Sequence, residues 1–176
     1  MYALIENNEI KEIFSNMRAL KINDVQYPKN IFTVWSESEL NNVGLYTVVF
    51  DNSNKKDDSF YTNTDVSYAF ADGKVTASYG TATAKELPDL KTEKKRIIKN
   101  QASELLTPTD WYVIKATDVE SYSVPSAVTT FRANIRSKSN EMESKIDACT
   151  TVDELAALYV YTDDSRPLGE FPTLEV

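Results

Sequence analysis

The chain has 176 residues, of which 41% are hydrophobic, so it can build a core in one ordinary domain or in two small ones. Acidic residues outnumber basic residues by 27 to 19, and the resulting net charge of −8 disfavours binding to a nucleic-acid backbone by the molecule as a whole. Histidine is absent and Cys149 is the single cysteine. An internal disulfide, the common zinc sites and the histidine-dependent nucleophile systems are therefore excluded.

Membrane and export signals are not apparent in the sequence. No apolar run approaches the roughly 20 residues that a membrane-spanning helix needs. The N-terminus reaches the acidic Glu6 almost at once and lacks the basic region of a secretion signal. We expect a protein of a reducing cytoplasm that makes no membrane contact and needs no cofactor.

Residues 1–85 are predicted to form a small β-rich domain. Apolar residues 2–5 and 10–14 are separated by Asn7-Asn8, and asparagine tolerates the left-handed conformation of tight hairpins. A second hairpin is predicted at Asp72-Gly73, because large and small residues alternate on both sides of this turn.

One short helix should interrupt these strands. Ser36 and Glu39 have the spacing of a capping box, in which each side chain hydrogen-bonds the other residue's backbone, and Gly44 supplies the helix stop. Residues 45–50 are rich in β-branched and aromatic side chains, which favours a strand directly after the helix. Residues 51–58 are polar and should form an exposed loop.

Residues 86–160 are predicted to form a helical hairpin followed by a third, short helix. Two stretches, 90–106 and 125–148, carry apolar residues at helical spacing. The apolar stripes consist of Ile97, Ile98, Ala102, Leu105 and Leu106 in the first stretch and of Val128, Phe131, Ile135, Met142 and Ile146 in the second. Thr151 and Glu154 have capping-box spacing, which indicates where the third helix begins.

The remaining features of this half complete the predicted architecture. Lys91, Lys95 and Lys99 recur every four residues and indicate a solvated helix face. Cys149, in register with the second stripe, should be a buried small hydrophobe. Residues 161–176, punctuated by proline and acidic residues, should form an extended tail able to lie on another subunit. The fold class is therefore α+β, with a β-rich domain 1–85, a helical domain 86–160 and the tail.

Between the two long helices lies a run that we interpret as a structural clasp formed by Asp110 and Trp111. A tryptophan just past a helix usually fills a core and finds a partner for its indole N–H. The sequence therefore predicts that Trp111 is buried and plugs the end of the helix pair.

Three motifs together resemble bacteriophage tail-fibre assembly and tail-assembly-chaperone-like proteins. They are the opening residues 1–8, the turn from residues 36–40 into Gly44-Leu45, and a helix followed by Thr109-Asp110-Trp111 and a second helix that carries Arg132 and Arg136. The resemblance implies a short β-rich N-terminal part followed by a helical hairpin with a Thr-Asp-Trp turn. Relatives of this kind are assembly factors or permanent parts of the virion, and both alternatives remain open.

Catalysis is not expected, because the carboxylate pairs all fall in predicted loops, where solvation is the default. These pairs are Asp57-Asp58, Asp118 with Glu120, and Asp163-Asp164. Acid/base work by two carboxylates requires a cleft that separates their pKa values, and no calcium-loop pattern is present. We therefore expect neither an enzyme nor a metal site.

Two functions from different classes follow from the sequence. The first is a phage tail-associated structural or assembly protein. It would contact tail or fibre proteins as repeated copies in a symmetric assembly, in the host cytoplasm during assembly and in the virion tail. Its expected contact residues are Tyr61, Tyr79 and Phe171, because interface hot spots favour aromatic side chains. The alternative is an acidic regulatory or decoy protein that binds a basic host partner, although the acidic residues are spread over loops rather than gathered together.

Overall fold

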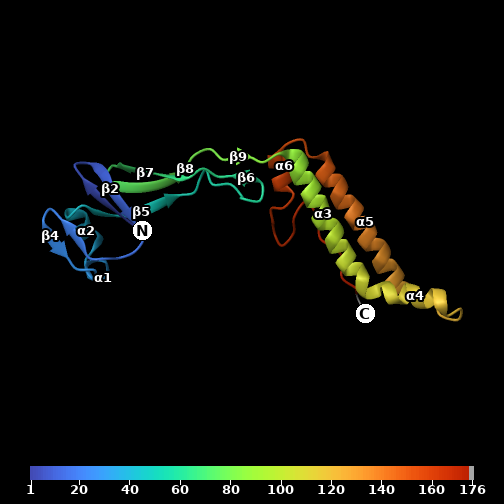
Figure 1. The fold of residues 1–176 in the computed structure, drawn as a ribbon. Coiled ribbons are helices and arrows are strands. Elements are labelled where there is room, and N and C mark those ends of the chain that lie inside the picture. The colour runs from blue at the N-terminus through green and yellow to red at the C-terminus, as the bar shows by residue number, and fades with distance from the viewer. Residues whose placement is uncertain (175–176) are drawn as a thin grey trace. The chain divides into compact units, whose positions relative to one another are not determined.

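A computed structural model describes residues 1–174 and shows the predicted α+β fold, with the strands in the first part of the chain and the long helices in the second (Figure 1). The chain divides into two compact units, Met1–Thr83 and Ala84–Val176, close to the boundary predicted at residue 85. The predicted tail, 161–176, is not a separate part, because it belongs to the second unit.

The first unit is built on a five-stranded sheet with the strand order β2–β1–β5–β8–β7. Its strands are β1 (Tyr2–Glu6), β2 (Glu9–Phe14), β5 (Leu45–Asp51), β7 (Val66–Ala71) and β8 (Lys74–Tyr79). Strands β5 and β8 run parallel, whereas the other neighbouring strands are antiparallel. A separate two-stranded ribbon pairs β6 (Tyr61–Thr62), which lies between β5 and β7 in the chain, with β9 (Thr83–Ala84), which follows β8.

Both predicted hairpins are confirmed, and each turn uses positive φ angles. Asn7 and Asn8 have φ angles of 53° and 65° between β1 and β2. Asp72 and Gly73 have φ angles of 52° and 69° between β7 and β8. Such angles are those of the tight turns whose twist matches the flanking strands.

A third hairpin was not predicted, although its turn has the same chemistry. It joins β3 (Leu20–Ile22) to β4 (Val25–Tyr27) through Asn23 and Asp24, whose φ angles are 48° and 64°. This hairpin and the short helices α1 (Ile31–Val34) and α2 (Glu37–Asn42) supply residues to one core of the unit. That core contains Leu4, Phe14, Leu20, Ile22, Ile31, Phe32, Leu40 and Leu45.

The helix α2 begins and ends as predicted. The Ser36 hydroxyl accepts a hydrogen bond from the Glu39 backbone N–H, while the Glu39 carboxylate accepts one from the Ser36 backbone at 2.7 Å. Gly44 follows the helix with a φ of 83°, and a Cβ atom there would lie only 2.6 Å from the carbonyl oxygen of Ile5. A glycine is therefore required both by the backbone angle and by the close approach of β1.

The second core, on β1, β5 and β8, contains Ala3, Ile5, Val48, Val75 and Ala77.

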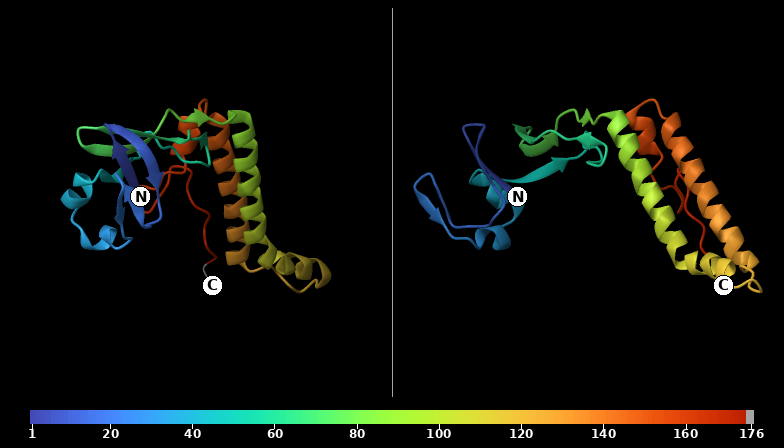
Figure 2. Two further views of the ribbon diagram at one scale, coloured as in Figure 1. Left: turned by 60° about the vertical axis from the view of Figure 1, so that its left-hand side comes forward. Right: turned by 45° about the vertical axis from the view of Figure 1, so that its right-hand side comes forward.

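The second unit is helical. Its elements are α3 (Leu87–Leu106), the 3₁₀ turn η1 (Thr107–Thr109), α4 (Asp110–Asp118), α5 (Ser126–Ala148) and α6 (Val152–Ala157). Helices α3 and α5 lie side by side, and α4 projects from the end of the pair (Figures 1 and 2). The predicted stripe of α5 is buried throughout, and Cys149, just after that helix, is also buried. Burial raises the pKa of the Cys149 thiol, as expected for a structural cysteine.

The C-terminal segment packs on its own unit, whereas the sequence predicted an extended tail able to lie on another subunit. The side chain of Leu168 is only 1% exposed, and its backbone N–H donates to the carbonyl oxygen of Leu158 at 3.0 Å. The ammonium of Lys145 donates to the carbonyl oxygen of Pro167 at 2.9 Å. Phe171 packs against the cluster formed by Ala102, Phe131 and Ile135. Leu168 and Phe171, the apolar residues between the prolines and the glycine, thus pack this segment against the helical unit.

Candidate protein-contact surface

The basic stripe of α3 connects the two long helices. Lys95 forms an ion pair with Asp147 at 2.7 Å, and the ammonium of Lys91 donates to the carbonyl oxygen of the same residue at 2.9 Å. Lys99 lies 3.2 Å from the carboxylate of Glu143. The stripe therefore serves to link α3 to α5, in addition to being a solvated face.

A clasp closes the end of the helix pair, and its central residue is Arg132 on α5. The Arg132 side chain is only 11% exposed and forms an ion pair with Asp110 at 2.7 Å. The same guanidinium donates to the Thr109 hydroxyl at 2.5 Å and to the carbonyl oxygen of Leu106 at 3.0 Å. One side chain thus joins α5 to the end of α3, to η1 and to the start of α4. Asp110 lies in this clasp, whereas the sequence did not indicate that Arg132 is its partner.

Trp111 is not part of the clasp, and the prediction that it is a buried plug is wrong. It is 50% exposed, and its ring lies 3.8 Å from that of the neighbouring Tyr112. The end of the helix pair, where the indole was expected, is closed instead by the Arg132 guanidinium and by the buried Thr109. Because η1 and α4 continue the chain away from the helix pair, the next side chain, that of Trp111, reaches solvent.

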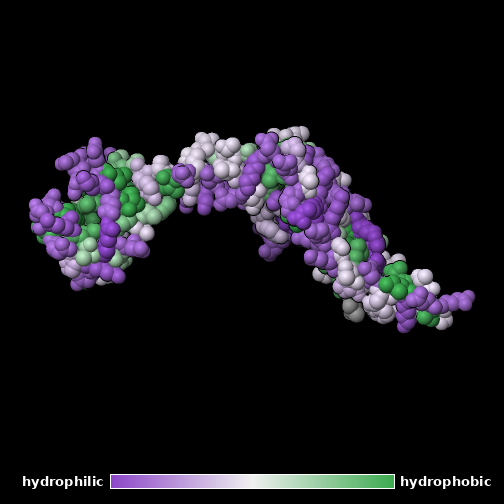
Figure 3. Space-filling view, viewed as in Figure 1, coloured by the Kyte–Doolittle hydropathy of each residue, from purple (hydrophilic) through white to green (hydrophobic). Residues whose placement is uncertain are grey.

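The helix α4, which we call the α4 arm, presents apolar side chains to solvent. None of its nine residues is buried. Trp111, Val113 and Ile114 are all exposed, Ile114 by 61%, and Val119 just beyond the helix is exposed too. Hydrophobic residues reach the surface over this part of the molecule (Figure 3). A helix at residues 110–118 was not predicted from the sequence, and neither was this surface.

A groove of about 450 Å³ lies at the base of the α4 arm, between α3 and α5. Three basic residues line it, namely Lys99, Arg132 and Arg136, together with Asp110. Arg136 donates to the backbone carbonyl of Arg132 at 3.2 Å, and within residues 1–174 no carboxylate forms an ion pair with it. The groove therefore carries a positive charge that the neighbouring side chains leave unbalanced.

The three aromatic residues predicted to contact partners are all at least partly buried. Tyr61 is only 5% exposed, so its side chain is used inside the fold. Tyr79 is half-buried, and the ammonium of Lys55 lies 5.5 Å from its ring centre. Phe171 is also half-buried and packs on the helical core, so it too is used internally. Partner contact through these residues is correspondingly disfavoured.

No cluster of three or more histidine, cysteine, aspartate or glutamate side chains in residues 1–174 could hold a metal ion. No helix in the same range combines the length and the apolar character needed to cross a bilayer. Comparisons with known proteins give no match among family models, curated proteins or solved structures.

Proposed function

We propose that this chain is a non-enzymatic bacteriophage tail-associated structural or assembly protein, and that it acts through protein–protein contacts made by the α4 arm. The observation that carries the proposal is that α4 has exposed apolar residues and no buried residue. Isolated helices shorter than about 12 residues are marginal in water, so most helices are stabilised by packing. A nine-residue helix that buries no side chain in its own chain is therefore suited to packing against another protein chain.

The other short helices of the molecule differ from α4 in this respect. Helices α2 and α6 have six residues each, and both have capping boxes. Each also buries apolar side chains, Leu40 in α2 and Val152 and Leu155 in α6. The α4 arm has neither a side-chain cap nor a buried residue. Burial within the chain thus contributes to the stability of these helices but not to that of α4.

The free energy available on the α4 arm is sufficient for a specific contact. Burying a side chain the size of valine or isoleucine contributes about 1.5–3 kcal/mol. Tryptophan is among the residues that most often dominate binding energy at interfaces. Trp111 and Ile114 are three residues apart on one helix, so the two side chains are neighbours and can enter the same partner surface.

Assignment of the partner to a phage tail is supported by the residues that carry the resemblance. Asp110 and Arg132 both belong to the resembling motifs, and they form the ion pair that fixes the start of the α4 arm. Trp111, from the same motif, is the adjacent exposed residue. One part of the motif thus holds the arm and the other part presents an aromatic side chain, which is a reasonable arrangement for an assembly contact.

The proposal is tested by recovering tagged protein from infected cells and measuring the tail and fibre proteins that co-purify. Wild-type protein should recover them, whereas Trp111→Gln/Ile114→Gln should recover at least about 10-fold less, corresponding to a loss of about 1.4 kcal/mol. Glutamine preserves helix propensity, so α4 should persist. Val49→Thr changes an exposed apolar residue in the first unit and should match wild type.

Two outcomes would contradict the proposal. Wild-type protein that recovers no tail component would remove the tail assignment, and recovery of basic host proteins instead would favour the acidic regulator. Equal recovery by wild type and by the double variant, both with unchanged circular dichroism, would show that the α4 arm is not the contact surface.

A further inference from the structure

We propose that the α4 arm is self-complementary and that its partner is the α4 arm of a second copy of this chain, packed antiparallel about a two-fold axis. This inference rests on the proposed function and deepens it, because the protein contact that the arm makes in the tail is then a contact between copies of this chain. It would also provide the repeated copies of a symmetric assembly.

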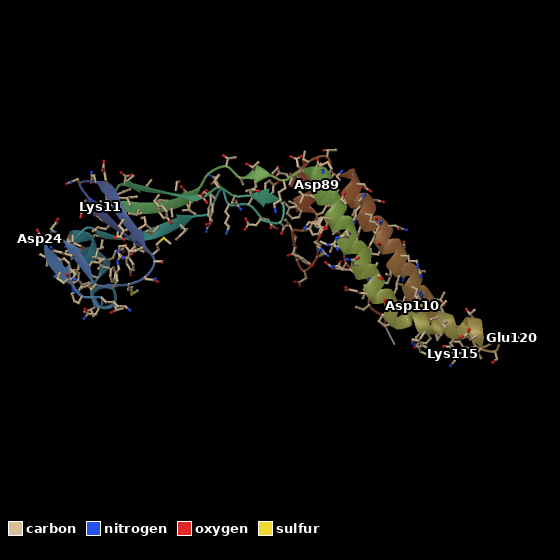
Figure 4. All side chains as sticks on the ribbon, in the orientation of Figure 1. Lys11, Asp24, Asp89, Asp110, Lys115 and Glu120 are labelled. Atoms are coloured by element: carbon tan, nitrogen blue, oxygen red, sulfur yellow. The ribbon has the colours of Figure 1, made fainter. Side chains whose placement is uncertain are left out.

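The first observation is that charge changes sign along the α4 arm. At its base, Arg132 and Arg136 line the groove together with a single acid, Asp110, which is paired with Arg132. At its tip, Asp118 and Glu120 are exposed, and within residues 1–174 neither forms an ion pair. Figure 4 shows Asp110 at the base of the arm, Lys115 along it and Glu120 at the tip. The base is therefore net positive and the tip is net negative.

The second observation is the position of the apolar residues between these two ends. Ile114 is the midpoint of α4, and Trp111 and Val113 lie close to it. An α-helix rises about 1.5 Å per residue, so residues 110 and 118 are roughly 12 Å apart along the axis. Two antiparallel arms that cross at Ile114 therefore place the tip of each arm at the base of the other.

The antiparallel arrangement satisfies both observations at once. The apolar residues of the two copies meet in the centre, and the tip carboxylates of each copy approach the groove that contains Arg136 of the other. Asp110 does not oppose this approach strongly, because Arg132 already balances its charge at 2.7 Å. A parallel arrangement would instead place like charges together at both ends. Each favourable contact occurs twice, as in any interface related by a two-fold axis.

The interface should be small, since it is formed mainly by one nine-residue helix and the adjoining groove from each copy. Small interfaces are characteristic of weak or transient complexes. We therefore expect a dimer with a Kd on the order of micromolar, which dissociates on dilution.

Charge-swap variants provide the test, with sedimentation velocity as the measurement. Arg136→Glu reverses the charge of the groove residue that is unpaired within residues 1–174, and Asp118→Lys/Glu120→Lys reverses the two charges at the tip. Wild-type protein should dimerise at concentrations above the micromolar range, and each variant alone should be monomeric because like charges then meet. An equimolar mixture should dimerise again. The reversed groove of the first variant then faces the reversed tip of the second, and the native tip of the first faces the native groove of the second.

Controls separate these effects from changes in folding or net charge. Lys74→Glu makes the same change of charge as Arg136→Glu, but at an exposed position of the first unit, and should dimerise like wild type. Trp111→Gln/Ile114→Gln removes the apolar centre without changing charge and should be monomeric. Circular dichroism checks that every variant is folded, and the uncharged variant tests the inference if a charge variant does not fold.

The inference is overturned if wild-type protein is monomeric well above the micromolar range, if the variants dimerise like wild type, or if the mixture stays monomeric. Wild-type monomer together with lost tail recovery by the arm variants would mean that α4 contacts a different protein, and the proposed function would stand. Binding of the monomer to lipid vesicles would assign the arm to a membrane surface instead.

Discussion

Helices α5 and α4 lie in the same unit and both carry apolar side chains, yet α5 buries its apolar residues and α4 buries none. The 23 residues of α5 run beside the 20 residues of α3, so one face of each is covered along its length. The nine residues of α4 follow η1, and the ion pair between Asp110 and Arg132 holds the start of α4 at the end of the helix pair. Apolar composition alone therefore does not determine burial, because the direction of the chain decides which helix is covered.

The largest expected difference comes from the same substitution made in both helices. Ile135→Ala should destabilise the protein by about 2–5 kcal/mol, because Ile135 is fully buried and the substitution leaves a cavity. Ile114→Ala should change the free energy of unfolding by less than about 0.5 kcal/mol, as is usual for exposed positions. Urea denaturation of dilute protein measures both values. Similar losses for the two variants would show that α4 is covered within its own chain.

A smaller effect is expected from the residue that connects the two helices. Arg132→Met should destabilise the protein by about 1–3 kcal/mol, because it leaves the Thr109 hydroxyl, the Leu106 carbonyl and the Asp110 carboxylate without the guanidinium donor. Arg136→Met is the matched control, since that side chain has no ion-pair partner within residues 1–174. Equal melting temperatures for the two variants would argue against the clasp.

Much of the fold was predictable because local chemistry determines it. The turns at Asn7-Asn8 and Asp72-Gly73, and the capping boxes begun by Ser36 and Thr151, involve residues within a few positions of each other. The Asn23-Asp24 turn has the same signal and was missed, although the sequence contained it.

The candidate contact surface was less predictable because it depends on long-range contacts. The sequence does not show that Arg132 reaches Thr109 from 23 residues away, and this contact takes the place expected for Trp111. The parallel pairing of β5 with β8 and the burial of Leu168 likewise depend on distant partners. The prediction that Trp111 is internal was therefore wrong.

The capped short helices differ from α4 in their expected pH dependence. Hydrogen bonds from Ser36 lower the pKa of Glu39 below 4.5, and hydrogen bonds from Thr150 and Thr151 lower that of Glu154. Their stabilising contribution is therefore present above pH 4.5 and is lost as the pH falls through the lowered pKa values. The melting temperature should fall over that range, and Glu154→Gln should reduce this dependence. Glu120→Gln, which removes a charge away from any cap, should leave the pH profile unchanged.

The smallest expected effect concerns Trp111. Trp111→Ala should change the free energy of unfolding by less than about 0.5 kcal/mol in dilute protein, because the indole is half-exposed and lies mainly against its neighbour Tyr112. A buried aromatic residue would lose about 3–5 kcal/mol on the same substitution. A thermal melt distinguishes the two cases, and a loss in the larger range would restore Trp111 to the core.

Hydrogen exchange across α4 tests the central claim most directly, namely that the α4 arm is uncovered in its own chain and becomes covered in the assembly. The amides of residues 110–118 are followed in dilute protein and in protein bound to tail particles, with α5 as the internal reference. In the dilute protein, exchange should be fast in α4 and slow in α5, and in the bound state exchange in α4 should slow strongly. Exchange in α4 that is as slow as in α5 in the dilute protein, or that is unchanged on binding, would contradict this claim.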